Sequence, residues 1–207
     1  MRNIPMRAVN QPAGQETHYR LNSPLLFGAL QSLDPEARLG ILDLAPANGQ
    51  LLAYFSTQHC KFILPGCRDA LLALRSTGVE GQPPLAEVIA RHLPLLQQET
   101  LDVILLWDLP NYLDKAVLSA LIAHLVPHVH ERSVLHLYLH TRQVMPAHPG
   151  EFRLGNDAVV LVELAAPWTA TSPMYYQESL HRLVAPFRIE RGMLLANGLQ
   201  EYFLRVK

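Results

Sequence analysis

The sequence predicts an α/β fold, in which a mostly parallel sheet has helices on both faces and ends in an antiparallel hairpin. Two apolar runs, at residues 39–44 and 101–106, have the length and composition of strands that are covered on both faces. Helical patterns follow each run, and such alternation is typical of parallel sheets. Near residue 197, Asn197-Gly198 separates two β-rich segments and predicts a tight turn between antiparallel neighbours.

The first half of the chain alternates helices with short strands. Ser23 and Pro24 predict a helix start, because serine favours the N-cap and proline the first helical position. Proline and glycine then break the chain into segments of helix or strand length. We expect helix at 23–33, strand at 38–45, helix at 49–58, strand at 60–64, and helices at 68–76 and 83–98.

The second half continues the alternation and then adds the hairpin. Ser172-Pro173 repeats the Ser-Pro pair and predicts another helix start. Residues 142–157 read as a long surface insertion. We expect strand at 101–109, helix at 114–126, strands at 133–141 and 158–164, helix at 172–187, and hairpin strands at 186–194 and 199–206. Residues 1–22 are expected to be an irregular tail, and residues 23–207 a single domain.

The composition excludes several classes of function. The chain has 207 residues, 49% of them hydrophobic, and a formal net charge of −1, so it can build a core but lacks a broad basic footprint for nucleic acid or anionic membrane. No apolar stretch reaches the length of a membrane span. We expect a cytoplasmic protein, because its two cysteines lack the spacing of a metal or redox site and no signal-peptide pattern is present near residue 1.

The stretch ILDLAPANGQLLAYF at residues 41–55 predicts a strand, a turn of small residues and a helix. Such a turn gathers backbone N–H groups and the positive end of a helix dipole at the carboxyl end of a sheet, where ligands usually bind. Glycine is favoured in these turns because a side chain would stand where the ligand lies. This turn has one glycine, Gly49, and two alanines, Ala45 and Ala47, each of which adds one methyl group.

Three segments together resemble the class I S-adenosylmethionine-dependent methyltransferases, which have a Rossmann-like fold. The stretch at 41–55 resembles the first motif of that family. The block LDVILLWDLPNYLDKAVLSALIAHLVPHVHERSVLHLYL at 101–139 is similar to the later strand, acidic loop, helix and strand. The closing helix and hairpin, LHRLVAPFRIERGMLLANGLQEYFLRV, match in order and spacing.

The resemblance implies a position for the methyl donor. Asp43 would help to organise the cofactor pocket, and Asp108 would face the substrate and stands as the candidate catalytic residue. The loop DLPNY is also read as a helix entry in which Asp108 or Asn111 caps backbone groups, and Trp107 and Tyr112 as pocket wall. The residues expected at the cofactor are Asp43, Leu44, Ala45, Ala47, Gly49 and Asp108.

Two features depart from the family pattern. In the family, the second strand ends in an acid that accepts hydrogen bonds from the donor's ribose, and here Leu64, Pro65 and Gly66 occupy that position. Losing two charge-assisted hydrogen bonds costs on the order of 3 kcal/mol, or roughly a hundredfold in affinity. The third-strand region, TGVEGQP at 77–83, is too short and glycine-rich to predict a strand. The family's contact to the adenine edge, usually an Asp after that strand, has no obvious counterpart, and Glu87 or Gln82 could replace it.

The histidines do not form a metal-binding pattern. Five of the ten histidines lie between residues 124 and 140, but no acid completes a metal motif, so no metal is expected. No nucleophile elbow or phosphate loop is present either.

Two functions of different class remain open. The first is a pseudoenzyme that binds S-adenosylmethionine weakly or not at all and acts through a ligand, a protein partner or a homodimer. The second is an active methyltransferase on a small molecule or protein. If the protein acts through contacts with a partner, we expect the contact surfaces at the insertion, residues 142–157, and at the helix residues Leu25, Leu26 and Phe27.

Overall fold

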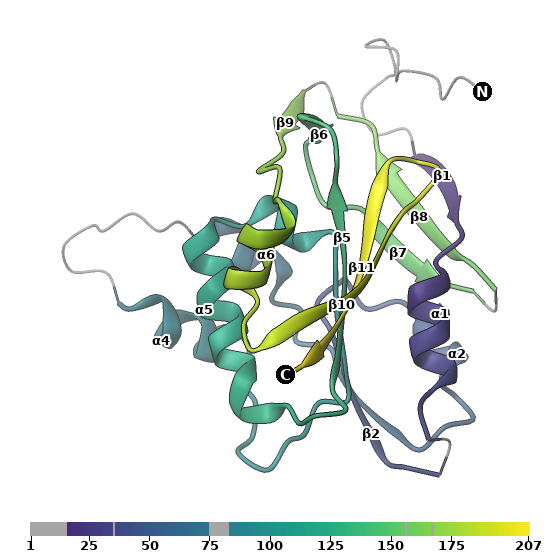
Figure 1. Cartoon of the computed structure of the whole chain (residues 1–207), viewed down its shortest axis with the longest axis vertical. Helices are drawn as coiled ribbons and strands as arrows, with labels where there is room; N and C mark the ends of the chain where they lie inside the picture. The colour runs from purple at the N-terminus through teal and green to yellow at the C-terminus, as the bar shows by residue number, and fades with distance from the viewer. Residues whose placement is uncertain (1–15, 35, 75–82, 156, 167) are drawn as a thin grey trace.

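The computed structural model describes residues 16–34, 36–74, 83–155, 157–166 and 168–207. A six-stranded sheet runs through the molecule in the order β10-β11-β5-β4-β2-β3 (Figure 1). Its strands are β2 (Leu39–Asp43), β3 (Cys60–Ile63), β4 (Val103–Trp107), β5 (Val134–His140), β10 (Phe187–Leu194) and β11 (Leu199–Val206). The helices are α1 (Pro24–Gln31), α2 (Gly49–Tyr54), α3 (Arg68–Ala73), α4 (Leu85–His92), α5 (Lys115–Leu125) and α6 (Gln177–Leu183), with 3-10 turns η1 (Leu109–Tyr112) and η2 (Val126–His128).

The predicted sheet centre and hairpin are confirmed. Strand β2 is parallel to both β3 and β4, with Ile41 opposite Val103, and β4 is parallel to β5. Strand β11 is antiparallel to β5 and to β10, and Gly198 takes the positive φ of 89° that the turn needs. The fold class expected from the sequence is therefore the observed one.

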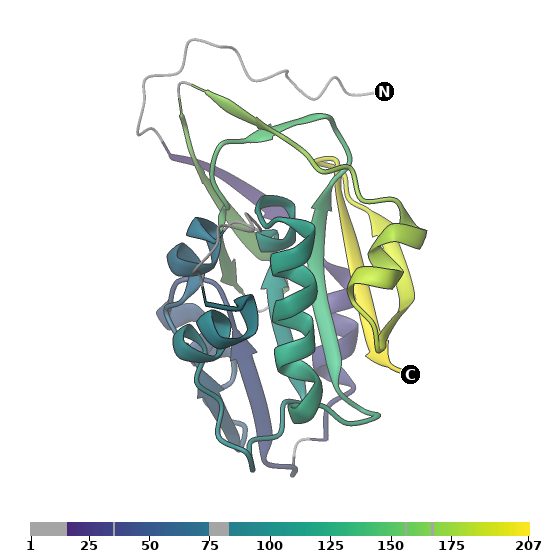
Figure 2. The same cartoon turned by 90° about the vertical axis from the view of Figure 1, so that its left-hand side faces the viewer.

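Two hydrophobic layers hold the sheet. In β2, Ile41 belongs to a cluster with α1 and α2, whereas Leu42 belongs to a cluster with α3, α4, α5 and α6. Strand β4 alternates in the same way through Val103 and Ile104. Figure 2 shows α5 lying across one face of the sheet, with α1 behind it. Both faces are thus covered, as the uninterrupted apolar runs predicted.

The insertion has structure of its own, which the sequence analysis did not anticipate. A second sheet, in the order β1-β8-β7, packs on the α1–α2 side and is built from β1 (Glu16–Leu21), β7 (Glu151–Leu154) and β8 (Val159–Leu164). A two-stranded ribbon joins β6 (Val144–Pro146) to β9 (Thr169–Thr171). The expected strand at 158–164 exists, but it lies in this second sheet.

Two expectations about the ends of elements are wrong, and a third lies almost wholly outside the described residues. Residues 16–21, expected to be irregular, form β1 because they pair with β8 along six residues, while residues 1–15 lie outside the described part. Helix α6 begins after Tyr176 rather than at Ser172-Pro173. The doubtful third-strand region, residues 77–83, falls almost wholly outside the described residues.

Helix α1 begins where predicted, but its apolar face is not a contact surface. Ser23 is the N-cap and Pro24 follows it, yet a distant carboxylate, Glu201 on β11, accepts the hydrogen bond from the Leu26 amide at 3.0 Å. Leu26 is 1% exposed, and its neighbours Leu25 and Phe27 are also buried. This part of the surface prediction is wrong because the helix packs against the hairpin and the second sheet. Of the described helices, none is long and apolar enough to cross a membrane.

Candidate functional site

The first turn forms at the carboxyl end of β2, as the sequence predicts. Asn48 is the N-cap of α2, and its side chain accepts a hydrogen bond from the Leu51 amide at 3.1 Å. Asp43 ends β2 and accepts a hydrogen bond from the Ala45 amide at 2.9 Å, which tightens the turn. The turn therefore closes through local side-chain acceptors, a common device where a strand meets a helix.

Asp43 is held by a second donor from the neighbouring strand. The indole Nε1 of Trp107 donates to Asp43 Oδ1 at 2.6 Å, while the other carboxylate oxygen, Oδ2, has no hydrogen-bond partner among the described residues. Burial raises the pKa of Asp43 to about 6, although the hydrogen bonds from Ala45 and Trp107 oppose the shift. Trp107 has a positive φ of 53°, an uncommon conformation for a large residue, at a register shift between β4 and β5.

Asp108, the candidate catalytic residue, faces a backbone amide of the insertion. It is 4% exposed, and its Oδ2 accepts a hydrogen bond from the Gly150 amide at 2.9 Å. Burial raises the pKa of Asp108 to about 7, with the Gly150 hydrogen bond opposing the shift and the charge of Glu163 adding to it. Such a carboxyl group is partly protonated near neutral pH.

The side chain of Asn111 caps backbone groups of the DLPNY loop and of β5. Its side-chain amide donates to the carbonyl oxygens of Asp108 and Tyr138, at 2.7 and 2.9 Å, and accepts from the His140 amide at 2.9 Å. The DLPNY loop is thereby tied to β5. Tyr112 donates from its hydroxyl to the His148 carbonyl at 2.9 Å, so this side chain also holds the insertion.

Residues 149–152 of the insertion lie over the crevice between the ends of β2 and β4. The aromatic ring of Phe152 stacks on Trp107, with ring centroids 5.0 Å apart and planes at 9°, and its carbonyl accepts from Asn48 Nδ2 at 3.1 Å. Pro149 and Gly150 line what remains of the crevice, a cavity of about 10 Å³. A cavity of this size holds about one water molecule. The other lining residues are Leu44, Ala45, Arg68, Leu106, Trp107, Asp108 and Leu109.

The six residues expected at the cofactor therefore fall into two groups. Four of them are buried around or beside the small cavity: Asp43, Leu44, Ala45 and Asp108. The remaining two, Ala47 and Gly49, are exposed on the outer side of the turn. A Cβ atom added at Gly49 would meet no described atom within 4 Å, so this glycine stands beside open space.

Among the described residues, the end of β3 offers no carboxylate for a ribose. The strand ends at Ile63, and Gly66 turns the chain with a positive φ of 61° before α3 begins. Asp69, the nearest acid in sequence, lies in the first turn of α3 with its side chain 90% exposed. The described residues therefore lack an acid at the end of β3 in the structure, as they do in the sequence.

Sequence reasoning missed the residues that fill the crevice. The segment HPGEF at 148–152 reads as a loop, and nothing local indicates that it reaches Asp108 and Asn48. Arg68 was likewise overlooked, although it follows β3 and lines the cavity. The signal that could have found the segment is an aromatic residue, Phe152, in alternation with Leu154 within an otherwise polar insertion.

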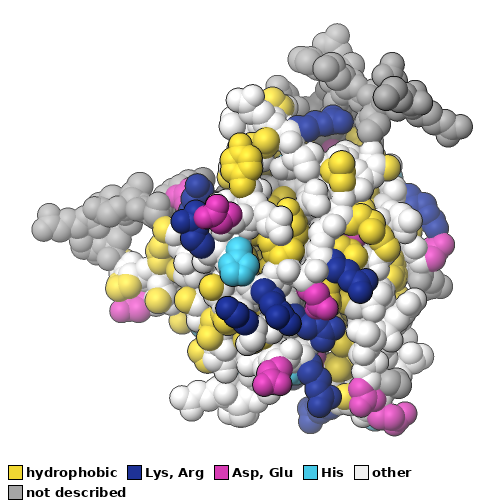
Figure 3. Space-filling model, in the orientation of Figure 1, with side chains coloured by type: hydrophobic (Ala, Val, Ile, Leu, Met, Phe, Trp, Pro, Cys, Tyr) yellow, Lys and Arg dark blue, Asp and Glu magenta, His cyan; other side chains and the backbone are white. Residues whose placement is uncertain are grey.

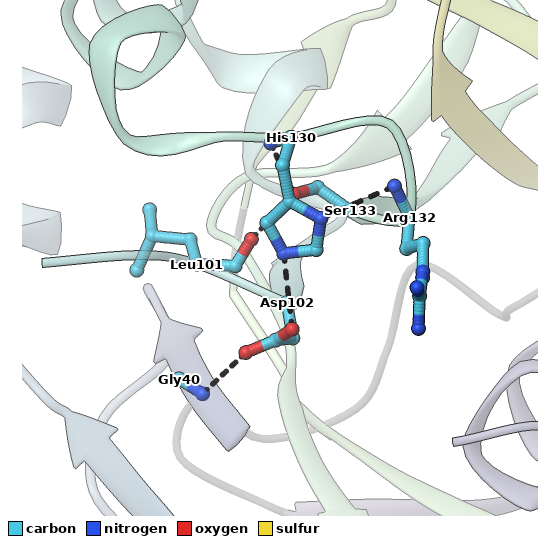
Figure 4. Close-up of polar contacts among 6 residues, drawn as sticks. All are labelled: Gly40, Leu101, Asp102, His130, Arg132 and Ser133. Atoms are coloured by element: carbon cyan, nitrogen blue, oxygen red, sulfur yellow. Dashed lines mark hydrogen bonds and ion pairs between the residues drawn. The ribbon is translucent and has the colours of Figure 1, made fainter. Parts of the chain in front are cut away.

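A second polar cluster lies at the opposite ends of the strands (Figure 4). Asp102 accepts from the Gly40 amide at 2.7 Å and contacts His130 Nε2 at 3.0 Å, while His130 Nδ1 accepts from the Arg132 amide at 3.2 Å. Ser133 Oγ donates to the Leu101 carbonyl at 2.6 Å. Because the serine hydroxyl and both ring nitrogens are engaged in this way, the cluster fixes the turn before β5 rather than forming a nucleophile with its base.

The other histidines of this region have separate hydrogen-bond partners, although the ring centroids of His124 and His128 lie 6.3 Å apart. His124 and His128 contact the carbonyl oxygens of Leu93 and Glu99, at 2.8 and 3.1 Å, and His136 contacts Glu201 at 3.0 Å. Within the part of the chain that the structure describes, no group of histidine, cysteine and acidic side chains is arranged to hold a metal ion.

Structural comparison places solved methyltransferases among the similar chains. The glycopeptide N-methyltransferase MtfA, complexed with S-adenosyl-L-homocysteine, is 11% identical, with a TM-score of 0.49 and 90% of each chain covered. An S-adenosylmethionine-dependent methyltransferase from Clostridium acetobutylicum is 13% identical, with a TM-score of 0.48, and the match covers 88% of this chain and 89% of the other. The 1,6-didemethyltoxoflavin-N1-methyltransferase of Burkholderia thailandensis is 14% identical, with a TM-score of 0.46, and the match covers 89% of this chain and 77% of the other.

No family model and no curated protein matches the sequence. The chain has a Rossmann-like, class I methyltransferase-like α/β fold, and the order and direction of the strands in its own central sheet carry that assignment.

Proposed function

We propose that this protein uses a methyltransferase fold without holding S-adenosylmethionine tightly, and that it acts through contacts with a protein or another ligand. The observation that carries the proposal is the position of residues 149–152. They occupy the crevice at which the sequence motifs would seat the methyl donor, and they leave a cavity of about 10 Å³. Pockets for ligands of nucleoside size measure roughly 300 Å³ or more.

The energy needed to open the crevice can be estimated from its contacts. Returning the 1%-exposed Phe152 side chain to water costs about 2 kcal/mol. The hydrogen bonds from Gly150 to Asp108 and from Asn48 to Phe152 contribute about 1 kcal/mol each. A donor that must first displace this segment therefore loses about 4 kcal/mol, which lowers its apparent affinity roughly a thousandfold.

The absent ribose acid supports the proposal independently. Pro65 and Gly66 follow β3, and Asp69 lies on an exposed face of α3. The missing hydrogen bonds cost on the order of 3 kcal/mol. Together with the closed crevice, this penalty favours an affinity in the millimolar range or weaker over the micromolar range.

Two observations favour the alternative, an active methyltransferase. Asp43 and the turn after it are retained, and Asp108 is a buried carboxyl group whose pKa is raised to about 7. A group of that pKa can accept a proton from an acceptor at neutral pH. This function requires residues 149–152 to move away, because they cover the Asp108 carboxylate.

Calorimetric titration with S-adenosylmethionine and with its demethylated product separates the two functions. Under the proposal, the wild-type protein gives no saturable heat below about 1 mM ligand. A low-micromolar dissociation constant, together with protection of the Ala45 and Gly49 amides from hydrogen exchange, would contradict the proposal and favour the active methyltransferase. A titration of the heat-unfolded protein controls for heats of dilution.

A further inference from the structure

Strand β10 forms an open edge of the central sheet. Among the described residues it pairs with one neighbour, β11, and no strand lies on its other side. Alternate residues of such a strand turn their backbone N–H and C=O groups outward, where another strand can bind them. Natural proteins usually shorten, cover or distort edges of this kind, so an open one needs an explanation.

Only the first half of this edge is distorted. A register shift between Ile189 and Arg191 interrupts the pairing of β10 with β11. From Arg191 to Leu194 the pairing is regular, and all four residues are exposed. Met193 and Leu194 are 40% and 63% exposed, although apolar side chains at a strand edge favour association. The segment 191–194 is therefore the part of the edge that is suited to pairing.

The surface around this edge is basic. Figure 3 looks onto it, and Lys and Arg side chains gather there over β10, β11 and α6. Five basic residues stand on this surface, against two exposed acids, Glu178 and Glu190. The basic residues are Arg182, Arg188, Arg191, Arg205 and Lys207. The chain as a whole has 17 basic and 18 acidic residues, so this surface is an exception to its overall balance.

The two acids do not neutralise the edge itself. Glu178 pairs with Arg182 at 3.7 Å, and Glu190 pairs with Arg205 at 2.9 Å. Arg188 and Arg191, on β10, form no salt bridge with any described residue. They therefore provide positive charge beside the open backbone groups.

The charge argues against a second copy of this chain as the occupant. Pairing two β10 strands edge to edge would bring the arginines of one copy close to those of the other, and like charges facing each other across a strand pair are destabilising. The same charge suits an acidic chain. The open backbone suits a polypeptide, since a nucleic acid or a lipid headgroup has no complementary row of amide groups.

We propose that β10 binds an extended acidic segment of another protein, which adds to the central sheet as a further strand over residues 191–194. Backbone hydrogen bonds fix the register, Glu or Asp residues of the partner contact Arg188 and Arg191, and apolar residues of the partner cover Met193 and Leu194. Strands β11 and β5 separate β10 from β4 in the sheet, so the inference holds whether or not the crevice accepts a methyl donor.

A labelled peptide of about nine residues that alternates Glu and Val tests the proposal by fluorescence anisotropy. We expect saturable binding that weakens as salt rises from about 0.05 M to 0.5 M. The same peptide with N-methylated alternate amides keeps the charge but cannot pair as a strand, and we expect it to lose binding at least tenfold. A peptide that alternates Lys and Val should not bind.

Protein variants test the location. The double variant Arg188→Glu/Arg191→Glu changes two exposed side chains and should weaken binding of the Glu–Val peptide at least tenfold. Arg38→Glu makes the same type of change at an exposed position before β2 and should leave binding unchanged. Circular dichroism checks that the variants fold.

Three results with the Glu–Val peptide would overturn the proposal. These are no binding of the Glu–Val peptide, equal binding of its N-methylated form, and binding that survives the double variant. Single-stranded RNA of about 20 nucleotides and vesicles that contain phosphatidylserine serve as anionic competitors. The reference is displacement of the labelled peptide by the same peptide without its label. If RNA or vesicles displace the labelled peptide at a lower concentration than the unlabelled peptide does, the surface is a general anion site and not a strand-binding edge.

Discussion

The indole of Trp107 and the carboxylate of Asp43 meet across the ends of two parallel strands, with 2.6 Å between Nε1 and Oδ1. Phe152, from the insertion, stacks on the same indole. One residue of β4 therefore joins the first turn to the segment that fills the crevice. Asp43 Oδ1 is therefore engaged by two donors of the protein, the Ala45 amide and the Trp107 indole.

The raised pKa of Asp43 predicts a pH-dependent effect of Asp43→Asn. Burial raises this pKa from 3.8 to about 6, so the folded state binds the proton more tightly than the unfolded chain. The stability that this proton contributes is present below pH 4 and is lost as the pH rises to about 6. Two pKa units correspond to about 3 kcal/mol. Asparagine does not titrate, so the free energy of unfolding of the variant, minus that of the wild type, should rise by up to about 3 kcal/mol between pH 4 and pH 7.

Urea unfolding at several pH values measures this difference. Asp69→Asn, at an exposed carboxylate of α3, controls for the general loss of a negative charge. A difference for Asp43→Asn that stays constant with pH would show that Asp43 is not the titrating group.

A second prediction concerns Glu201, which joins α1 to the hairpin. Its carboxylate, with 0% exposure, accepts from Ser23 Oγ and from the Leu26 amide and contacts His136 Nε2 at 3.0 Å. Although burial alone would raise the pKa of Glu201, the hydrogen bonds and charge of His136 and the bonds from Ser23 and Leu26 hold it below its usual value. Glu201→Gln replaces one acceptor oxygen by a donor and removes the charge, so it should lower the free energy of unfolding by about 3 kcal/mol.

Glu190→Gln is the matched control, because Glu190 pairs with Arg205 on the surface. It should change stability by less than about 0.5 kcal/mol. Equal effects of the two substitutions, measured by urea unfolding, would contradict the structural role of Glu201.

The parts of the fold that the sequence predicted are those with local or strongly periodic signals. The strand at 103–107, the turn at Asn197-Gly198 and the helix at 115–125 depend on apolar spacing and turn chemistry. Strand β1 has no such signal, because its residues ETHYRL are polar and its partner β8 lies more than 130 residues away. Its pairing is a tertiary effect that local propensity does not encode.

The same limit applies to the site. The missing acid after β3 is visible in the sequence, because a motif fixes where it should stand. The closure of the crevice is not visible, since it depends on Gly150 reaching Asp108 from an insertion 42 residues further along the chain. Motifs predict where a ligand would lie, but they do not show which other segment lies there instead.

Two glycines give opposite predictions on replacement by alanine. A Cβ atom added at Gly40, in β2, would lie 1.9 Å from the backbone oxygen of Thr100, which cannot move without breaking the strand ends. Gly40→Ala should therefore destabilise the protein by about 3 kcal/mol or more. Gly28, inside α1, has no described atom within 4 Å of such a Cβ apart from its chain neighbours and the backbone of its own helix, and Gly28→Ala should stabilise the helix by about 0.5–1 kcal/mol. Thermal unfolding of the two variants measures both signs, and a stable Gly40→Ala protein would show that the chain near Thr100 is loosely held.

The last prediction separates the two causes of weak donor binding. If only the missing ribose acid mattered, Pro65→Asp would restore affinity for S-adenosylmethionine by roughly a hundredfold. If the closed crevice dominates, Pro65→Asp alone changes little, and Phe152→Ala is needed to remove the ring that stacks on Trp107 at 5.0 Å. We expect that neither single variant binds below about 1 mM and that the double variant gains at least tenfold.

Calorimetry on the three variants measures the gain, and Gln177→Asp, which adds the same charge at an exposed position of α6, is the control for non-specific electrostatics. Phe152→Ala also leaves a cavity and should cost about 3–5 kcal/mol of stability, so its titration needs a temperature at which circular dichroism shows a folded protein. Strong binding by Pro65→Asp alone would mean that residues 149–152 leave the crevice at little cost. This result would favour an active methyltransferase, because the Asp108 carboxylate would be open to a methyl acceptor.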